Sequence, residues 1–347
     1  MLKTTFVIIG LTLTYAIYVY PVTVLLHLIF DFKILQTHFL LATIILSISS
    51  LWCLRTKKYQ PLLRQVVHYT MGVGFIAFFI VNPALAISYL DPDSKFYIGI
   101  IATVLILLAC IFSLKNGRDV KVKKLLFESE KIDRRLNFAF ISDVHIGSNP
   151  RSHLEEICSE VMLLDVDYLL IGGDLFDTSS FKAHDLEPFL KLECPIYFVT
   201  GNHEYYVDGY KEKLEQLQRY NISILDNEVV SFSSINLVGV SDNQSEEKQI
   251  QITNALVTEE MYNVVIIHKP SIWEKVSQNV DLMLSGHTHK GQIFPFNFFV
   301  RLKFKNVYGL FEDGSNRLYV SSGSGTWGPR MRLGTQNEIL KISIQPI

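Results

Sequence analysis

The sequence has few cysteines and little net charge, and each shortage argues against a class of protein. The four cysteines show no paired spacing, which argues against a disulfide framework and favours free thiols in a reducing compartment; they are Cys53, Cys110, Cys158 and Cys194. Lys and Arg number 32 against 34 Asp and Glu, so the formal net charge at pH 7 is −2. Because general affinity for nucleic acid needs excess positive charge, we expect no nucleic-acid partner.

Charged residues are also missing from four apolar stretches in the first third of the chain. Each stretch is long enough, at about 20 residues, to cross a bilayer as a helix. The stretches are Phe6–Phe30, Ile34–Leu54, Val66–Leu90 and Phe96–Leu114. We therefore predict a multi-pass transmembrane domain of four helices over residues 1–114. Because charged groups inside a membrane mark ion pathways, their absence argues against a transporter and favours a membrane anchor.

Basic residues flank these stretches unevenly, and their distribution predicts an orientation. The connection between the second and third stretches carries Arg55, Lys57, Lys58 and Arg64, and the segment after the fourth carries Lys115, Arg118, Lys121, Lys123 and Lys124. The connection Asp91–Lys95 is not basic. Since cytoplasmic loops are enriched in Lys and Arg, we expect both termini and all residues after 115 to be cytoplasmic, at the cell membrane.

Beyond a basic linker at residues 115–133, short apolar runs typical of strands recur, and each ends at polar residues. They are Leu136–Ser142, Tyr168–Ile171, Ile196–Val199, Val264–Ile267 and the run that begins at Val280. A helical stretch from about His153 to Leu164 follows the first run. Strands that alternate with helices predict a layered α/β domain over residues 134–347, with its site at the carboxyl edge of the sheet.

The polar residues at these five strand ends are suited to binding metal ions. Alternate residues of an extended segment face the same way, so His287 and His289 can reach one small volume, and Gly286 allows close approach of the backbone. Taken singly, each residue also fits an ordinary turn or edge position. The seven candidate ligands are Asp143, His145, Asp174, Asn202, His268, His287 and His289.

Seven ligands are too many for one tetrahedral ion and suit two divalent ions. Mixed nitrogen and oxygen donors favour manganese, iron or zinc over magnesium, which prefers oxygen. A carboxylate is the natural bridge between two such ions, and water held between them becomes a nucleophile near neutral pH.

With these motifs in this order, the sequence resembles the calcineurin-like metallophosphoesterases over residues 134–347. The motifs are Asp143-x-His145, Gly173-Asp174, Gly201-Asn202-His203-Glu204, His268 and Gly286-His287-x-His289. The segments His287–Gln292 and Gly325–Gly334 resemble the membrane-attached bacterial branch, although Lys290 stands where that branch often has glycine. The resemblance implies a four-layer α/β/β/α sandwich with a dinuclear metal site at the sheet edge.

The resemblance also implies a role for each residue. Asp143, His145, Asp174 and His289 would hold one ion, and Asp174, Asn202, His268 and His287 the other, with Asp174 as the bridge. His203 would face the substrate, where it stabilises charge or protonates the leaving oxygen, and Asp177 would orient His203. Arg332 is a weaker candidate for a phosphate contact. The expected reaction is in-line attack on phosphorus by a hydroxide that bridges the two metals.

The substrate stays open at this point. Between Gln292 and Phe311, aromatic and basic residues interleave, which fits either a partly buried loop or an interfacial element that meets lipid headgroups. The first hypothesis is a phosphoesterase that acts on a membrane lipid or lipid-linked substrate. The alternatives are a phosphodiesterase for a soluble nucleotide, and a non-enzymatic membrane sensor or scaffold that retains the fold.

Overall fold

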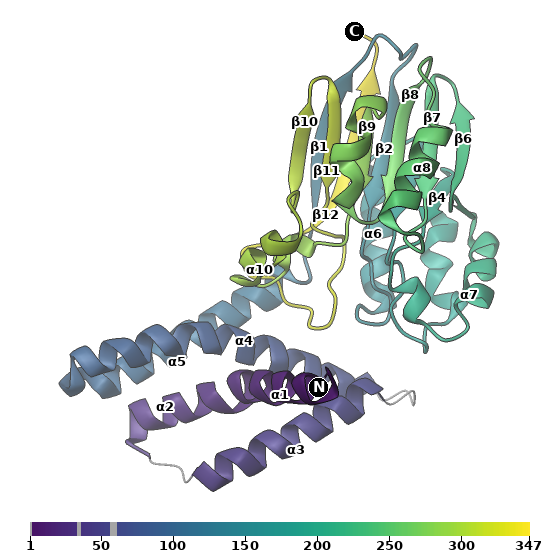
Figure 1. Cartoon of the computed structure of the whole chain (residues 1–347). Coiled ribbons are helices and arrows are strands. Elements are labelled where there is room, and N and C mark those ends of the chain that lie inside the picture. Colours follow the sequence, from purple (N-terminus) through teal and green to yellow (C-terminus); the bar gives the residue numbers. More distant parts are fainter. Residues whose placement is uncertain (1, 33–35, 56–60) are drawn as a thin grey trace. The chain divides into compact units, whose positions relative to one another are not determined.

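The computed structural model describes residues 2–32, 36–55 and 61–347, and the chain divides into two compact units, Met1–Lys115 and Asn116–Ile347. The first unit is helical and the second contains both sheets (Figure 1). Each unit is described below by itself.

The helices of the first unit are α1 (Leu2–Thr14), a π-helical turn (Tyr15–Val19), α2 (Tyr20–Phe30), α3 (Gln36–Arg55), α4 (Pro61–Leu90) and α5 (Lys95–Asn116). Three segments of the described residues are long and apolar enough to cross a membrane: Val7–Phe30, Leu62–Leu90 and Pro92–Asn116. The second predicted span forms α3, which is not among these three, so that its crossing stays a prediction. Ile34, Lys57 and Lys58 lie outside the described residues.

The first sheet of the second unit has six strands in the order β1-β12-β2-β3-β4-β5. These are β1 (Val120–Glu128), β12 (Asn337–Gln345), β2 (Leu136–Ile141), β3 (Tyr168–Gly172), β4 (Ile196–Val199) and β5 (Ile222–Ile224). Strands β2 to β5 are parallel to one another, and β12 pairs antiparallel with β2 and parallel with β1. The sheet is therefore mixed.

The second sheet also has six strands, in the order β10-β11-β9-β8-β7-β6. These are β10 (Gly309–Asp313), β11 (Asn316–Val320), β9 (Leu282–Ser285), β8 (Tyr262–Ile267), β7 (Ile235–Val240) and β6 (Glu228–Phe232). The four central strands are parallel, and the edge strands β10 and β6 pair antiparallel with their neighbours.

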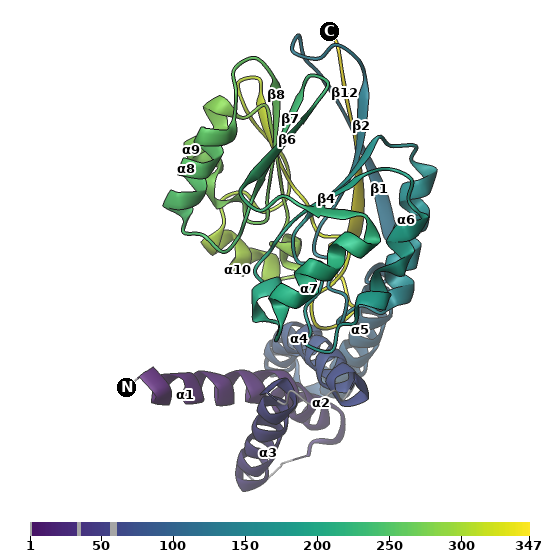
Figure 2. The ribbon, with the colours of Figure 1, turned by 90° about the vertical axis from the view of Figure 1, so that its right-hand side faces the viewer.

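Helices of the second unit are α6 (Arg151–Leu163), α7 (Tyr210–Leu217), α8 (Glu246–Leu256), α9 (Trp273–Val276) and α10 (Phe296–Lys303). Shorter 3₁₀ helices lie at Ala183–Lys191, Glu204–Tyr206, Gln218–Tyr220, Pro270–Ile272, Ser277–Asn279 and His289–Gly291. Helices α8 and α9 lie beside the second sheet and α6 beside the first (Figure 2).

The strands divide their side chains between separate hydrophobic clusters, as the two-residue period of a strand requires. In β2, Phe138 and Phe140 join a cluster that both sheets share, while Ala139 and Ile141 join one shared with α6. In β8, Ile266 joins the shared cluster, and its neighbours join one with α9. Both faces of these strands are therefore buried, which explains why they read as continuous apolar runs.

Residues 120–128, which the sequence analysis assigned to a basic linker, form the edge strand β1. The side chains of Val120 and Val122 pack against one core cluster, and Leu125 and Phe127 belong to the cluster between the sheets. Lysines alternate with these apolar residues, as is common in edge strands. Because of these charges, the sequence of β1 resembles that of a polar linker.

Candidate metal centre

The predicted ligands lie in loops that follow the carboxyl ends of β2, β3, β4, β8 and β9. Five of them have a positive φ, which non-glycine residues rarely adopt and which costs on the order of 1–3 kcal/mol at each position. They are Asp143 (54°), His145 (49°), Asp174 (54°), His287 (71°) and His289 (49°). Such strain persists only where the surrounding structure holds the backbone, so these loops have a fixed shape that directs the side chains inward.

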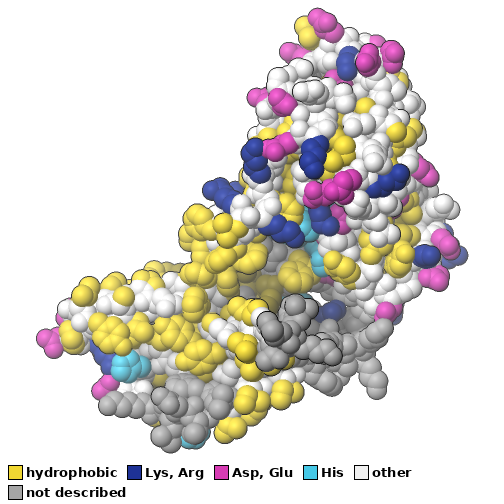
Figure 3. All heavy atoms as spheres, viewed as in Figure 1, with side chains coloured by type: hydrophobic (Ala, Val, Ile, Leu, Met, Phe, Trp, Pro, Cys, Tyr) yellow, Lys and Arg dark blue, Asp and Glu magenta, His cyan; other side chains and the backbone are white. Residues whose placement is uncertain are grey.

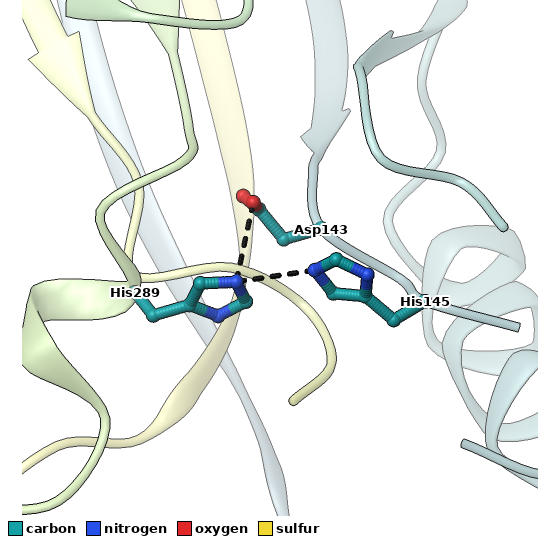
Figure 4. A group of neighbouring side chains, drawn as sticks. All are labelled: Asp143, His145 and His289. Atoms are coloured by element: carbon teal, nitrogen blue, oxygen red, sulfur yellow. Dashed lines mark hydrogen bonds and ion pairs between the residues drawn. The ribbon is translucent and has the colours of Figure 1, made fainter. Parts of the chain in front are cut away.

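Asp143, His145 and His289 form the first group of converging donors (Figure 4). The Nε2 atom of His289 lies 3.1 Å from Nε2 of His145 and 3.4 Å from Oδ1 of Asp143. The first two residues follow β2 of the first sheet, and His289 follows β9 of the second. The two sheets therefore supply donors to a single volume, and the group is suited to hold one cation.

Asp174, His268 and His287 form a second group. His268 Nε2 lies 3.1 Å from Asp174 Oδ2 and 3.2 Å from His287 Nδ1. The same Oδ2 atom is 3.8 Å from Nε2 of His145, which belongs to the first group. Asp174 therefore stands between the two groups, where a bridging carboxylate is expected.

Burial sets the protonation state of three of the histidines in these two groups. It lowers the pKa of His145 to about 3, of His289 to about 3 and of His287 to about 2. These imidazoles are therefore neutral at pH 7, and neutral imidazole is the form that binds metal ions.

Asp174 and His268 form a charged pair. Burial disfavours charge on both, but the charge of Asp174 raises the pKa of His268 to about 10, and the charge of His268 holds the pKa of Asp174 well below its usual value. The Nδ1 atom of His268 lies 2.8 Å from the carbonyl oxygen of Gly172, which fixes the ring and directs Nε2 toward Asp174. A cation bound between them would displace the shared proton.

Buried atoms in the same region also fit a metal site. Within the part of the chain that the structure describes, the buried Oδ1 of Asn202 has no hydrogen-bond partner. An unpaired buried carbonyl oxygen is costly, and a cation would satisfy it. This unpaired oxygen therefore fits the presence of a metal ion in this region.

Two glycines let the loops approach these carboxylates. A Cβ atom on Gly286 would lie 2.3 Å from Asp143 Oδ2, and one on Gly201 would lie 2.2 Å from Asp174 Oδ1. A Cβ atom would also lie 2.6 Å from Ser142 Oγ at Gly286 and 2.6 Å from the backbone N of Asp174 at Gly201, so neither position can accept a side chain without a shift of the loop beside it. The role given to Gly286 in the sequence analysis therefore has a direct steric basis.

Glu204 follows His203 in the third motif, and its side chain joins two loops of the site. Its fully buried carboxylate accepts hydrogen bonds from the backbone N–H groups of Asp174, Leu175, Phe176 and Gly201, at 2.7–3.2 Å. Burial raises the pKa of Glu204, and these N–H groups act against that rise. Glu204 thus ties the loop after β3 to the loop after β4.

His203 lies at the edge of the site. Its Nε2 atom is 3.9 Å from Asp174 Oδ2, its ring centroid is 4.7 Å from that of His145, and 18% of its side chain is exposed. It also belongs to a group of possible metal donors with His145 and Asp174, so the donors alone do not separate a ligand from a proton donor.

Asp177 lies beside one of the predicted ligands. The carboxylate of Asp177 accepts hydrogen bonds from Ser148 N and Oγ and lies 3.5 Å from His145 Nδ1, so these contacts place it beside His145; its action on His203 stays a prediction.

Arg332 is fully buried, and its guanidinium donates to five acceptors: Asn337 Oδ1, Thr335 Oγ1 and the carbonyl oxygens of His289, Ser322 and Gly325. A surface phosphate contact is therefore a wrong expectation for this side chain, because its donors already hold the loop of His289.

Comparison with known proteins identifies relatives of the second unit. The model of the calcineurin-like phosphoesterase family matches residues 136–291. An uncharacterized metallophosphoesterase of Helicobacter pylori is 37% identical over 238 residues, which cover 65% of this chain and 64% of that protein. The chain thus spans somewhat less than two thirds of this relative's length.

Two further relatives differ in length. An uncharacterized metallophosphoesterase of Aquifex aeolicus is 30% identical over 241 residues, which cover 65% of this chain and 92% of that protein. A protein of Bos taurus, named as a transmembrane protein with metallophosphoesterase domain, is 31% identical over 235 residues, which cover 60% of this chain and 53% of that protein.

Proposed function

Because the chain belongs to the calcineurin-like phosphoesterase family, we propose that it is a membrane-anchored phosphoesterase that depends on two divalent metal ions. The observation that carries this proposal is the position of Asp174, whose Oδ2 atom faces both groups of donors. The three apolar helices of the first unit support the membrane anchor.

The proposed ligands divide between the two ions as the family pattern implies. Asp143, His145 and His289 would hold one ion, Asn202, His268 and His287 would hold the other, and Asp174 would contribute to both. When bound, two such ions activate a water molecule and draw charge from the phosphoryl oxygens. Manganese, iron and zinc all suit these donors.

The side chains of the protein position the reacting groups. His203 is partly exposed at the edge of the site, where its imidazole can stabilise the phosphoryl oxygens through its N–H or, when protonated, transfer a proton to the leaving oxygen. Its backbone N–H donates to Asp174 Oδ1 at 2.8 Å, which fixes its place relative to the proposed bridge. We propose that Asp177 acts through His145, which it contacts, as well as on His203.

We further propose a four-layer α/β/β/α order for the second unit and four membrane spans for the first. The three hydrophobic clusters, one between the sheets and one on each outer face, support the layers. Helix α3 has 20 residues, which is enough for the additional span. The basic residues after α5 support a cytoplasmic second unit.

The proposed substrate is a phosphoester of a lipid or a lipid-linked precursor. Two exposed aromatic side chains, Tyr206 and Trp327, flank His203 with ring centroids 5.5 Å and 5.8 Å from its own. An apolar leaving group would find a complementary surface there. The membrane anchor would hold the site close to substrates of this class.

The test is an assay of the full chain, purified with Mn²⁺, against detergent-solubilised lipid phosphoesters and a panel of cyclic nucleotides. We expect turnover of the lipid set and none for Asp174→Asn. Preference for the nucleotides would contradict the lipid substrate and leave the phosphoesterase in place. Absence of hydrolysis with manganese, iron and zinc alike would contradict the enzyme itself and favour a sensor or scaffold.

A further inference from the structure

The segment that follows His287 and His289 exposes an unusual number of large apolar side chains. Helix α10 and the two residues before it carry five that are about half exposed or more: Phe294, Phe296, Phe298, Phe299 and Leu302. In Figure 3, apolar side chains gather over the place of α10 in Figure 1, with basic side chains beside them. A water-soluble surface rarely exposes so many contiguous aromatics without a partner.

Basic residues border this apolar surface. Arg301 and Lys303 lie in the last turn of α10, Lys305 follows it, and all three are exposed. Lys305 pairs with Glu274, which leaves Arg301 and Lys303 as the main positive charges of the helix. Aromatic residues combined with Lys and Arg at one surface are typical of helices that lie in the interface of an anionic bilayer.

The helix is firmly joined to the metal centre. Phe304, the residue after α10, is buried, and its ring centroid lies 5.2 Å from that of His287. At the other end, the backbone of Asn297 comes so close to Gly291 that a Cβ atom there would lie 2.4 Å from it. A surface that holds α10 therefore also fixes the position of the metal centre relative to itself.

Exposed aromatics continue from α10 toward the substrate side of the site. The side chain of Gln292 donates to the carbonyl oxygen of Trp327 at 3.0 Å and accepts from its N–H at 3.0 Å, which ties Trp327 to the segment before α10. Trp327 in turn lies beside His203. Exposed aromatic side chains therefore lie both on α10 and, through Trp327, beside His203.

The connection between the last apolar helix and the first strand of the second unit is short. Helix α5 ends at Asn116 and β1 begins at Val120, so three residues join the last apolar helix to the first strand. The four backbone steps from Asn116 to Val120 span at most about 14 Å. A bilayer crossed by α5 therefore lies near the amino end of β1.

From these observations we propose that α10 is a membrane-contacting helix, which inserts Phe298, Phe299 and Leu302 among the lipid acyl chains. Arg301 and Lys303 then contact anionic headgroups, and the mouth of the metal centre faces the headgroup layer. The proposal rests on the membrane anchor of the proposed function but not on hydrolysis, so it can fail or succeed separately from the enzymatic proposal.

The test measures lipid contact in the full chain reconstituted in nanodiscs. In a background with the four native cysteines replaced by alanine, Leu302→Cys is labelled with an environment-sensitive fluorophore, and lipids that carry a nitroxide serve as quencher. The matched control is Leu163→Cys, because Leu163 is 79% exposed and Leu302 is 85% exposed. Leu163 ends α6, which leads back to the amino end of β3, at the sheet edge opposite the metal centre.

We expect the label at residue 302 to be quenched at least about twofold in discs that contain phosphatidylglycerol, as for a side chain at the acyl boundary. The label at residue 163 should show no quenching, and Arg301→Glu with Lys303→Glu should reduce the quenching at residue 302. Equal signals at residues 302 and 163 would overturn the proposal. A label at residue 302 that is shielded from water but not quenched by lipid would also overturn it, in favour of a protein partner or a second copy.

Discussion

The substitution Glu204→Gln tests whether a carboxylate that touches no metal ligand side chain controls the metal centre. Glutamine has the size of glutamate but offers one acceptor oxygen in place of two, and its NH₂ group faces the N–H groups that the second oxygen served. Each carboxylate oxygen of Glu204 accepts two backbone N–H groups: Oε1 from Leu175 and Phe176, Oε2 from Asp174 and Gly201. Either orientation of the amide therefore leaves two buried N–H groups without an acceptor.

The expected loss follows from these contacts. A hydrogen bond to a charged group contributes about 1.5–3 kcal/mol, so losing two should lower the free energy of unfolding by about 3–6 kcal/mol. That loss is comparable with the whole stability of many domains, about 5–15 kcal/mol. Because two of the N–H groups belong to Asp174 and to the residue before Asn202, metal affinity should fall as well.

Urea unfolding of the full chain in detergent, followed by tryptophan fluorescence, measures the loss, and elemental analysis measures bound metal. Glu215→Gln on the exposed face of α7 makes the same chemical change without a buried carboxylate and should be nearly neutral. A Glu204→Gln protein that unfolds within about 1 kcal/mol of the native chain and binds the same metal would refute this role of the buried carboxylate.

Three further outcomes follow from the site. Asp174→Asn should abolish both metal occupancy and turnover, and unchanged metal content by elemental analysis would contradict its role as bridge. His203→Ala should retain metal but lose turnover about a hundredfold or more, the usual size of a lost general acid; equal loss of metal would make His203 a ligand. In the metal-free protein, the free energy of unfolding should fall as pH drops below about 6.5. Three buried histidines then bind protons in the unfolded chain but stay neutral in the folded one. Those histidines, His145, His287 and His289, have pKa values of about 3, 2 and 3 when folded and outnumber His268, whose raised pKa acts oppositely. A melting temperature that is the same at pH 7 and pH 5 would contradict this reasoning.

The strands that carry the site were predictable because their pattern is local. The predicted run Ile196–Val199 is β4, and Leu136–Ser142 is β2 with one residue more. Each such run is buried on both faces and ends at a loop that carries polar residues, so burial and termination both appear in the sequence. The family resemblance, which is confirmed, depends on these same strand ends.

The parts that sequence reasoning missed depend on partners far away in the chain. Nothing near Arg332 indicates that its guanidinium meets carbonyl oxygens of two separate segments, at His289 and at Ser322 to Gly325, so an exposed position was the natural expectation. The same holds for Glu204, whose N–H partners mostly follow β3, about 30 residues earlier. Strand β1 was missed because it pairs only with β12, at the other end of the chain.

The position of β12 has a consequence for biosynthesis. This strand lies between β1 and β2 in the first sheet, and the Gln345 side chain at its end donates a hydrogen bond to Glu128 of β1, 217 residues earlier in the sequence. During translation β1 emerges long before its neighbour exists, and such distant pairing is slow to form. The first sheet therefore cannot form completely until nearly the whole chain has been synthesised. A premature stop codon before β12 would leave β1 and β2 without the strand that joins them.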